Sequence, residues 1–248
     1  MPDLSICIPA YDMGGDGARF LRESLDVLKK QTFRSFEVIV SDQSDESAVQ
    51  EVCDAAGAGM AVRHLWFREG KRQASANCNN AIRHARGDIV KVLFQDDLLS
   101  GDDALEKIAA GFADPHVSWA LCGSGVTRDG TTVERPMIPR MHPQIHFGKN
   151  TVSSPSVLAA RRDKVLEFDE DLIWLMDVEI YRRYELQYGP PAILPDTLIL
   201  NRLHAGQVSA GVTPDLRRRE LAYVRQKFSG SEAFRDRLAY LKQVLKAR

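Results

Sequence analysis

The sequence predicts an α/β protein in which a mainly parallel central sheet is flanked by helices and followed by a C-terminal helical extension. Short apolar runs alternate with helical periods through the first two thirds of the chain, which is the pattern of parallel strands joined by helices. The 248 residues are enough for one large domain with a substantial core. The composition, 44% hydrophobic and 27% charged, is typical of a soluble globular protein.

The first half of the chain carries the strand–helix alternation. The predicted elements are strand 4–9, helix 18–31, strand 36–41, a helix capped near Ser44 or Asp45, strand 62–67, helix 75–86, a strand from Gly87 to Asp96 and Asp97, helix 102–112 and strand 117–122. Their boundaries rest on apolar spacing and on capping residues. Gly87, for example, directly follows the helix over 75–86, where glycine is the usual C-terminal signal.

The pattern changes in the second half. Residues 128–131 (Arg-Asp-Gly-Thr) are typical of a hairpin turn, and residues 135–155 carry four prolines with little periodicity, which favours a functional or mobile loop. Helical spacing returns over 172–188, and 192–200 has the composition of a strand. From Pro214 onward the chain is helical and basic, with ten Lys or Arg against four Asp or Glu.

Bulk properties exclude several classes of protein. The net charge of −1 argues against a general nucleic-acid-binding role. No apolar run approaches the ~20 residues that span a bilayer, and Asp3 interrupts a signal-peptide pattern, so we expect a cytoplasmic protein. The four cysteines are scattered without metal-binding spacing, and we expect buried thiols, as at Cys7 and Cys122, rather than disulfides.

Asp96 and Asp97 stand at the carboxyl end of a predicted buried strand, where open α/β sheets bind their ligands. Two adjacent carboxylates repel each other unless a cation or strong hydrogen-bond donors neutralise them. A hard divalent metal that carries a phosphate ester is one partner of this kind. The alternative is a strand that ends in a solvated Asp-Asp turn, and this segment alone does not decide between the two.

The first two predicted strands end in residues suited to a nucleotide. Tyr11 follows Pro9 at the end of the first strand, where its ring could stack on a base or simply close the edge of the sheet. Asp42 ends the second strand, where it could accept hydrogen bonds from a base or ribose or cap the next helix. The glycines at 14, 15 and 17 lack the third position of the dinucleotide-binding fingerprint, so that motif is absent.

Taken together, the motifs resemble those of family 2 glycosyltransferases with the GT-A fold. The resemblance covers roughly residues 4–209, and its motifs occur in the family's order. They are Ile8-Pro9-Ala10-Tyr11, Phe36-Glu37-Val38-Ile39-Val40-Ser41-Asp42, Ala85-Arg86-Gly87-Asp88, Gln95-Asp96-Asp97, Leu175-Met176-Asp177-Val178-Glu179, and Arg202-Leu203-His204 followed by Ser209.

The resemblance implies an inverting transfer of sugar from a nucleoside-diphosphate sugar, preferably a UDP-sugar, to a glycan or lipid-linked acceptor. It divides the chain into a donor-nucleotide half (1–122), an acceptor and base half (123–213) and a basic helical extension (214–248). The donor-binding residues that it implies are Pro9, Tyr11, Asp42, Arg72, Asn77, Gln95, Asp96 and Arg202.

The resemblance also implies Mn²⁺ or Mg²⁺ bound to the donor diphosphate, with Asp96 and His204 as metal ligands and Asp97 as a further candidate. Phe94 stands where the family's first metal carboxylate is usual, and Ser41 where many relatives have a second Asp. Because Phe94 cannot bind a cation, we expect low metal affinity in the absence of donor.

Asp177 is the catalytic base that the resemblance implies. Apolar neighbours on a helix raise the pKa of an Asp, which suits a base that works near neutral pH. The alternative for this residue alone is a surface Asp paired with Arg182 or Arg183. The resemblance gives Glu179 a supporting role.

The basic extension mixes apolar residues with Lys and Arg, as do helices that lie on anionic membranes. Many members of the family that the chain resembles elongate lipid-linked glycans. The resemblance therefore implies peripheral contact with the inner face of the plasma membrane through residues 214–248, in a role such as polysaccharide biosynthesis. Its alternatives are a helical cover on the core and a homodimer contact.

Two other functions stay open at this stage. A nucleotidyltransferase would use similar carboxylates, although only Gly14, Gly15 and Gly17 hint at its glycine-rich loop. A non-catalytic sugar-nucleotide or glycan-binding module is supported by Phe94.

Overall fold

A nine-stranded mixed sheet forms the centre of the computed structural model, which describes residues 2–204, 206–207, 211–231 and 233–247. The strand order is β3-β2-β1-β4-β8-β6-β9-β5, and β7 pairs with β6 beside this path. The strands are β1 (Leu4–Ala10), β2 (Phe36–Asp42), β3 (Val62–Trp66), β4 (Ile89–Val92), β5 (Leu98–Leu99), β6 (Trp119–Thr127), β7 (Glu134–Met137), β8 (Leu158–Arg161) and β9 (Ala192–Arg202).

The N-terminal half of the sheet is parallel, as the sequence predicts. Strand β1 pairs in parallel with β2 and β4, and β2 pairs in parallel with β3. All seven residues of β1 and all seven of β2 are buried, because helices cover both faces of these strands. The other half is mixed: β8 runs antiparallel between β4 and β6, whereas β6 and β9 are parallel.

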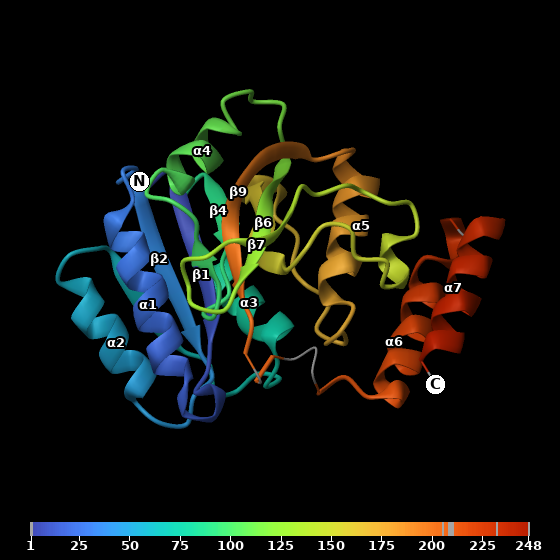
Figure 1. Ribbon diagram of the computed structural model, residues 1–248, viewed down its shortest axis with the longest axis horizontal. Coiled ribbons are helices and arrows are strands. Elements are labelled where there is room, and N and C mark those ends of the chain that lie inside the picture. Colours follow the sequence, from blue (N-terminus) through green and yellow to red (C-terminus); the bar gives the residue numbers. More distant parts are fainter. Residues whose placement is uncertain (1, 205, 208–210, 232, 248) are drawn as a thin grey trace.

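Seven α-helices surround the sheet in the described part of the chain. They are α1 (Gly17–Lys30), α2 (Ala48–Gly57), α3 (Ala74–Arg83), α4 (Ala104–Ala110), α5 (Met176–Tyr188), α6 (Pro214–Lys227) and α7 (Phe234–Lys246). Short 3-10 turns occur at Met13–Gly15, Ile145–Phe147, Pro155–Val157, Arg162–Lys164 and Ser229–Ser231. Figure 1 shows α1 and α2 on one side of the sheet and α5, α6 and α7 on the other. The predicted helical extension is therefore confirmed as α6 and α7.

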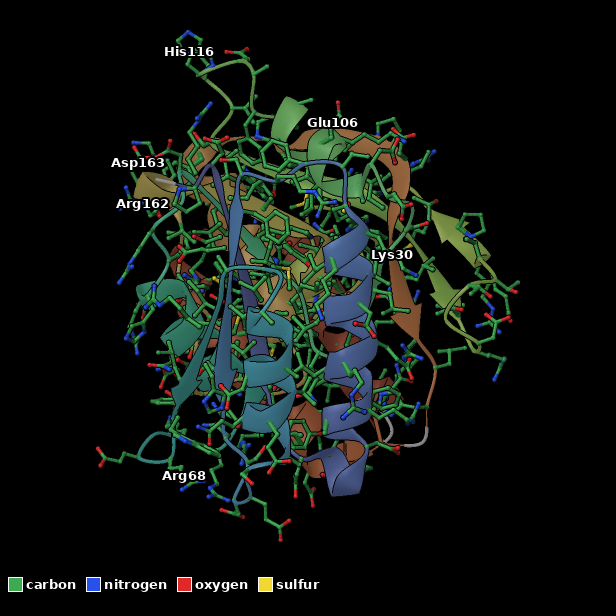
Figure 2. All side chains as sticks on the ribbon, turned by 90° about the vertical axis from the view of Figure 1, so that its left-hand side faces the viewer. Lys30, Arg68, Glu106, His116, Arg162 and Asp163 are labelled. Atoms are coloured by element: carbon green, nitrogen blue, oxygen red, sulfur yellow. The ribbon has the colours of Figure 1, made fainter. Side chains whose placement is uncertain are left out.

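Helix α1 shows why these sequences form these elements. Phe20, Leu21, Leu25 and Leu28 recur at helical spacing, and all four are buried in the structure. Figure 2 shows α1 and α2 side by side in front of the sheet, with charged residues such as Lys30 pointing outward. No helix in the described residues is both long and apolar enough to cross a membrane.

Two helix starts differ from the predictions. Helix α2 begins at Ala48 after Ser47, later than expected, because the Asp42 carboxylate accepts the Ser44 amide (2.8 Å) and closes a turn first. Helix α5 begins at Met176 rather than at 172, and residues 173–175 before it form a bend. The sequence also misses the short strands β5 and β8.

The predicted hairpin turn lies between β6 and β7, where Asp129 accepts the amides of Thr131 and Thr132. The proline-containing segment 135–155 is partly packed rather than wholly irregular, because Ile145 and Phe147 are buried. The four cysteines are buried free thiols, which confirms the predicted lack of disulfides.

Candidate active site

A cavity of about 560 Å³ opens at the carboxyl ends of β1, β2 and β4, where a parallel sheet is expected to bind its ligand. The sheet edge and two helices bring together most of the residues that the sequence singles out. Those that line the cavity are Pro9, Tyr11, Arg72, Asn77, Gln95, Asp96, Asp97 and Asp177. They come from segments up to 168 positions apart in the chain, from Pro9 to Asp177.

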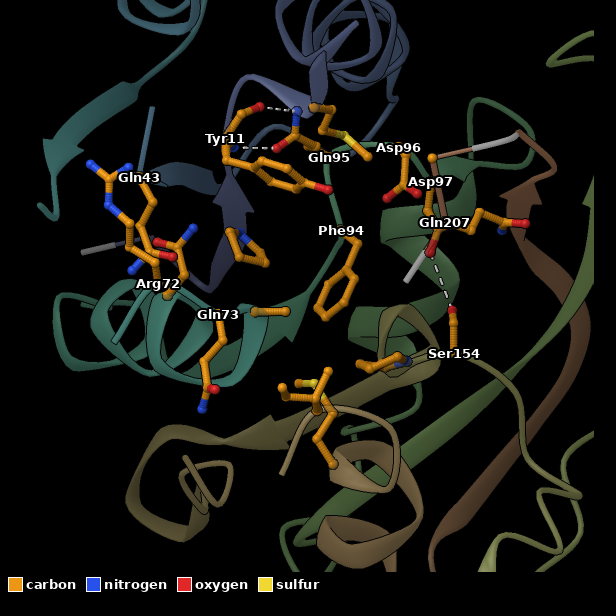
Figure 3. Close-up of a pocket in the computed structure, with 18 of the residues that line it drawn as sticks. Tyr11, Gln43, Arg72, Gln73, Phe94, Gln95, Asp96, Asp97, Ser154 and Gln207 are labelled. Carbon is orange, nitrogen blue, oxygen red and sulfur yellow. Dashed lines mark hydrogen bonds between the residues drawn. The ribbon is translucent and has the colours of Figure 1, made fainter. Parts of the chain in front are cut away.

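Tyr11 projects its ring into the cavity and is held there by Gln95 (Figure 3). The Gln95 side chain accepts the Tyr11 amide at 2.6 Å and donates to the Tyr11 carbonyl at 3.0 Å. A second donation, from Gln95 Nε2 to the Gly17 carbonyl at 3.1 Å, fixes the glutamine to the start of α1. Tyr11 remains 39% exposed, so one face of its ring is available to a planar ligand.

Asp42, Arg202 and His204 are not among the described residues that line the cavity. Asp42 is fully buried, and its carboxylate lies 2.8 Å from His64 Nε2 and accepts the Ser44 amide. Arg202 pairs with Glu23 of α1 at 2.6 Å and donates to the Asp96 carbonyl at 3.2 Å. Asp42 and Arg202 therefore support the cavity wall from behind, and their direct contact with a donor stays a prediction.

Arg72 and Asp45 form a bidentate ion pair at the rim of the cavity. The side chains are both exposed, so the pair can open at little cost when an anion or a base replaces one partner. Gln43 lines the same rim and donates to the Lys71 carbonyl at 2.7 Å. The sequence did not single out Gln43, although its position directly after Asp42 places it at the same strand end.

Asp96 and His204 form the candidate metal site. Asp96 Oδ2 lies 2.9 Å from His204 Nε2. At this separation the two atoms share a hydrogen bond, so a cation bound by both would replace that bond and would need an unprotonated Nε2. Within the described residues, no group of three or more His, Cys, Asp or Glu side chains is placed to hold a metal ion. Asp96 and His204 are therefore two candidate ligands, and a metal at this position would need phosphate oxygens and water as its other ligands.

Asp97 is buried and turned toward hydroxyl groups. Its Oδ2 accepts Ser156 Oγ at 2.5 Å and Ser154 Oγ at 3.2 Å. Burial, followed by the charge of Asp96, raises the pKa of Asp97 to about 7. The buried Lys91 ammonium donates to the Ser156 carbonyl and holds this segment in place, and burial lowers its pKa. Oδ2 of Asp97 is therefore occupied by hydrogen bonds from within the protein.

Asp177 lies in the first turn of α5 and faces the cavity. Its Oδ1 accepts the Val178 amide at 2.7 Å, and its Oδ2 accepts Asn150 Nδ2 at 2.8 Å. Burial raises the pKa of Asp177 to about 7, with a smaller contribution from the negative charge of Glu220. The alternative pairings expected from sequence are absent in the described residues, because Arg182 binds Glu185 and Arg183 binds Glu179.

Apolar side chains line the same cavity as Asp96 and Asp177, and sequence reasoning did not assign them to it. They are Phe94, Pro155, Ile173, Trp174, Met176 and Val212. Phe94 was noticed only as a missing carboxylate, whereas its ring projects into the cavity (Figure 3). Ser209, the last residue of the motifs quoted above, lies outside the described residues.

Comparison with known proteins identifies relatives by sequence. A family model described as "Glycosyl transferase family 2" matches residues 5–184. An uncharacterized protein of Mycobacterium tuberculosis (strain CDC 1551 / Oshkosh) is 29% identical over 210 residues, which cover 75% of this chain and 63% of the relative. An uncharacterized glycosyltransferase of Rickettsia prowazekii (strain Madrid E) is 23% identical over 224 residues, which cover 84% of this chain and 66% of the relative. The chain thus spans less than two thirds of the length of these relatives.

Solved structures share the fold. Staphylococcus aureus TarS 1-349 in complex with UDP-GlcNAc matches with a TM-score of 0.74 and 19% identity, over 100% of this chain and 72% of that one. The mannosyltransferase PcManGT from Pyrobaculum calidifontis, in complex with GDP-Man and Mn²⁺, matches with a TM-score of 0.66 and 16% identity, over 99% and 74%. Because the family model matches most of the chain, this protein belongs to glycosyl transferase family 2 and has the GT-A fold.

Proposed function

We propose that this protein transfers a sugar from a nucleoside-diphosphate sugar to an acceptor hydroxyl with inversion at the anomeric carbon. The observation that carries the proposal is the position of Asp177. This carboxylate has its pKa raised to about 7 and lines the same cavity as Tyr11 and Asp96 at the strand ends. A base and a diphosphate-facing carboxylate on one cavity are the two groups that a single displacement needs.

The donor occupies the strand-end side of the cavity in this proposal. The Tyr11 ring stacks on the nucleobase, and Arg72 releases Asp45 to bind the diphosphate or the base. A UDP-sugar is the donor we favour; TarS is bound to UDP-GlcNAc and PcManGT to GDP-Man.

Asp96 and His204 would hold a divalent metal, Mn²⁺ or Mg²⁺, against the donor diphosphate. The metal would supply positive charge that stabilises the leaving nucleoside diphosphate. The supporting observations are that the two side chains contact each other and that PcManGT binds Mn²⁺. Arg202 donates to the backbone carbonyl of Asp96 and so steadies this carboxylate.

Asp177 accepts the proton of the acceptor hydroxyl as the hydroxyl oxygen attacks the anomeric carbon. The new C–O bond forms on one face of the sugar while the bond to the diphosphate oxygen breaks on the other. The bond electrons leave with the diphosphate, and the proton passes from Asp177 to solvent. Asp177 must be ionised to act, so activity rises with pH through the pKa of about 7.

The acceptor in this proposal is a glycan or a lipid-linked glycan. The apolar side chains that include Phe94 and Trp174 line the same cavity as Asp177, and in this proposal they contact the apolar face of a sugar ring. The exposed face of α7 supports a peripheral membrane location in this proposal. It carries Phe234, Leu238, Leu241 and Leu245, with the basic residues Arg235, Lys242 and Lys246 exposed beside them. We propose that this face rests on an anionic membrane at its cytoplasmic surface.

A panel of nucleotide sugars tests the function. The purified protein is incubated with UDP-glucose, UDP-GlcNAc, UDP-galactose or GDP-mannose and Mn²⁺, and released nucleoside diphosphate is measured with and without glycan acceptors. We expect turnover with one of these donors. Binding of UDP or GDP by calorimetry without turnover of any donor would instead indicate a binding module.

A further inference from the structure

Helix α6 presents a row of polar side chains to the segment that precedes Asp177. Glu220, Tyr223 and Lys227 recur at spacings of three and four residues, so they share one face of the helix. This face packs against the turn that leads into α5, and Leu221 and Val224 beside it are fully buried. The row therefore connects the C-terminal part of the chain with the candidate base.

The Glu220 carboxylate accepts three consecutive backbone amides. Its Oε1 accepts the Ile173 amide at 2.8 Å, and its Oε2 accepts the Trp174 and Leu175 amides at 3.0 and 2.8 Å. Leu175 is the N-cap residue of α5, and its side chain cannot accept a hydrogen bond. Glu220 therefore provides, from another helix, the acceptor that the local sequence lacks.

The same face of α6 also holds both sides of this turn. Tyr223 donates to Asp169 at 2.9 Å, before the turn. The Lys227 ammonium binds Asp169 as well, and lies 2.8 Å from Glu179, two residues after Asp177. Glu179 in turn accepts Arg183 Nε at 2.6 Å. The backbone that carries Asp177 is thus fixed from 169 to 179 by a single helix.

Glu220 differs from an ordinary capping residue because its carboxylate is buried. Glu220 is only 1% exposed, and a buried charge is costly unless hydrogen bonds compensate for it. Three amides at the N-terminus of a helix supply that compensation, because the helix dipole also favours a negative charge there. Residues 173, 174 and 176 line the cavity, so the backbone that Glu220 fixes is part of the cavity wall.

We propose that Glu220 is a positioning residue for the transfer reaction: its carboxylate fixes the backbone of 173–175 so that Asp177 faces the acceptor hydroxyl. This inference rests on the proposed function of Asp177. It makes α6 a component of the catalytic unit rather than a separable extension.

The inference has an electrostatic consequence. The groups whose hydrogen bonds or charge act on Asp177 are the Val178 amide of α5, the uncharged Asn150 from the loop before β8 and Glu220 of α6. Glu220 is the negative charge that raises the pKa of Asp177. Removing that charge lowers the pKa of Asp177, so more of the base is ionised at low pH.

Glu220→Gln and Glu220→Ala test the inference, with Arg219→Gln on the exposed face of α6 as the matched control. Glu220→Gln removes the charge and keeps one acceptor oxygen. We expect the acid limb of kcat with UDP-GlcNAc or GDP-mannose to move to lower pH by about half a unit or more. Glu220→Ala removes every acceptor, and kcat should fall on the order of tenfold to hundredfold while the Kd of UDP changes by less than about twofold.

A readout without turnover separates this inference from the proposed function. Amide hydrogen exchange at 173–175 should become at least about tenfold faster in Glu220→Ala than in the wild type or the Arg219→Gln control. Unchanged exchange would overturn the inference. A stable Glu220→Gln protein with an unmoved acid limb would also overturn it, because a purely structural residue would lower thermal stability alone. Faster exchange in Glu220→Ala, together with a wild-type protein that turns over no donor, would instead refute the proposed function.

Discussion

The side-chain amide of Asn150 donates a 2.8 Å hydrogen bond to Oδ2 of Asp177. Its Oδ1 accepts the amides of Val152 and Ser153, each at 2.9 Å, so Asn150 also shapes its own loop. Ser153 has φ of 122°, a region that costs a non-glycine residue about 1–3 kcal/mol. The following Ser154 donates to Asp97. One strained segment therefore connects the two carboxylates whose pKa is raised to about 7.

Asn150→Ala should raise the pKa of Asp177, because the hydrogen bond that this variant removes stabilises the charged carboxylate. We expect the acid limb of kcat to move to higher pH by up to about one unit, which corresponds to roughly 1.4 kcal/mol. The pH dependence of kcat checks this, with Lys149→Ala, an exposed neighbour, as control. An acid limb that stays in place or moves down would show that this bond does not tune Asp177.

Asp96→Asn and His204→Ala should each reduce the affinity for UDP in the presence of Mn²⁺ on the order of tenfold or more, because each removes a metal ligand. Calorimetry with UDP, with and without Mn²⁺, measures the effect, and both variants should bind UDP without metal about as the wild type does. Asp88→Asn, an exposed carboxylate away from the cavity, serves as control. Undiminished Mn²⁺ enhancement in both variants would remove them from the metal site.

Tyr11→Ala should raise the Kd of UDP by about fivefold to hundredfold, because stacking of a base on an aromatic ring is worth about 1–3 kcal/mol. Tyr11→Phe keeps the ring and should bind within about twofold of the wild type. Equal losses in both variants would assign the effect to the hydroxyl group rather than to stacking.

The apolar face of α7 should hold the protein on anionic vesicles. Replacement of Leu238 and Leu241 by Ser should abolish flotation with phosphatidylserine-containing vesicles, whereas vesicles of phosphatidylcholine alone should bind the wild type weakly. Sedimentation of the wild type and the variant reports the oligomeric state. Loss of a dimer without any vesicle binding would assign this face to a second copy of the chain.

The sequence predicts best what local residues determine. The apolar runs of β1 and β2 and the spacing of Phe20, Leu21, Leu25 and Leu28 identify their elements. The motifs at two strand ends and at the start of α5 contain Tyr11, Asp96 and Asp177, which line one cavity. What it misses depends on contacts between distant residues. The contact that fixes Tyr11 comes from Gln95, and the start of α5 depends on Glu220, 45 positions after Leu175.

The positions of Asp42 and Arg202 also depend on contacts between distant residues. Both stand at strand ends where a ligand contact is expected, yet Asp42 pairs with His64 and Arg202 pairs with Glu23. The sequence around each residue does not indicate that an ion-pair partner from a neighbouring strand or helix lies close to it. Strand-end position therefore predicts which residues surround a site more reliably than which of them face into it.

Turnover and UDP binding of Asp177→Asn test the central claim most directly. With the donor that the wild type uses, the account predicts that kcat falls by about 10²–10⁴-fold while the Kd of UDP stays within about twofold. Asp163→Asn, an exposed carboxylate remote from the cavity, should leave both values unchanged. Near-wild-type turnover in Asp177→Asn would contradict the account, because the reaction would then proceed without its proposed base.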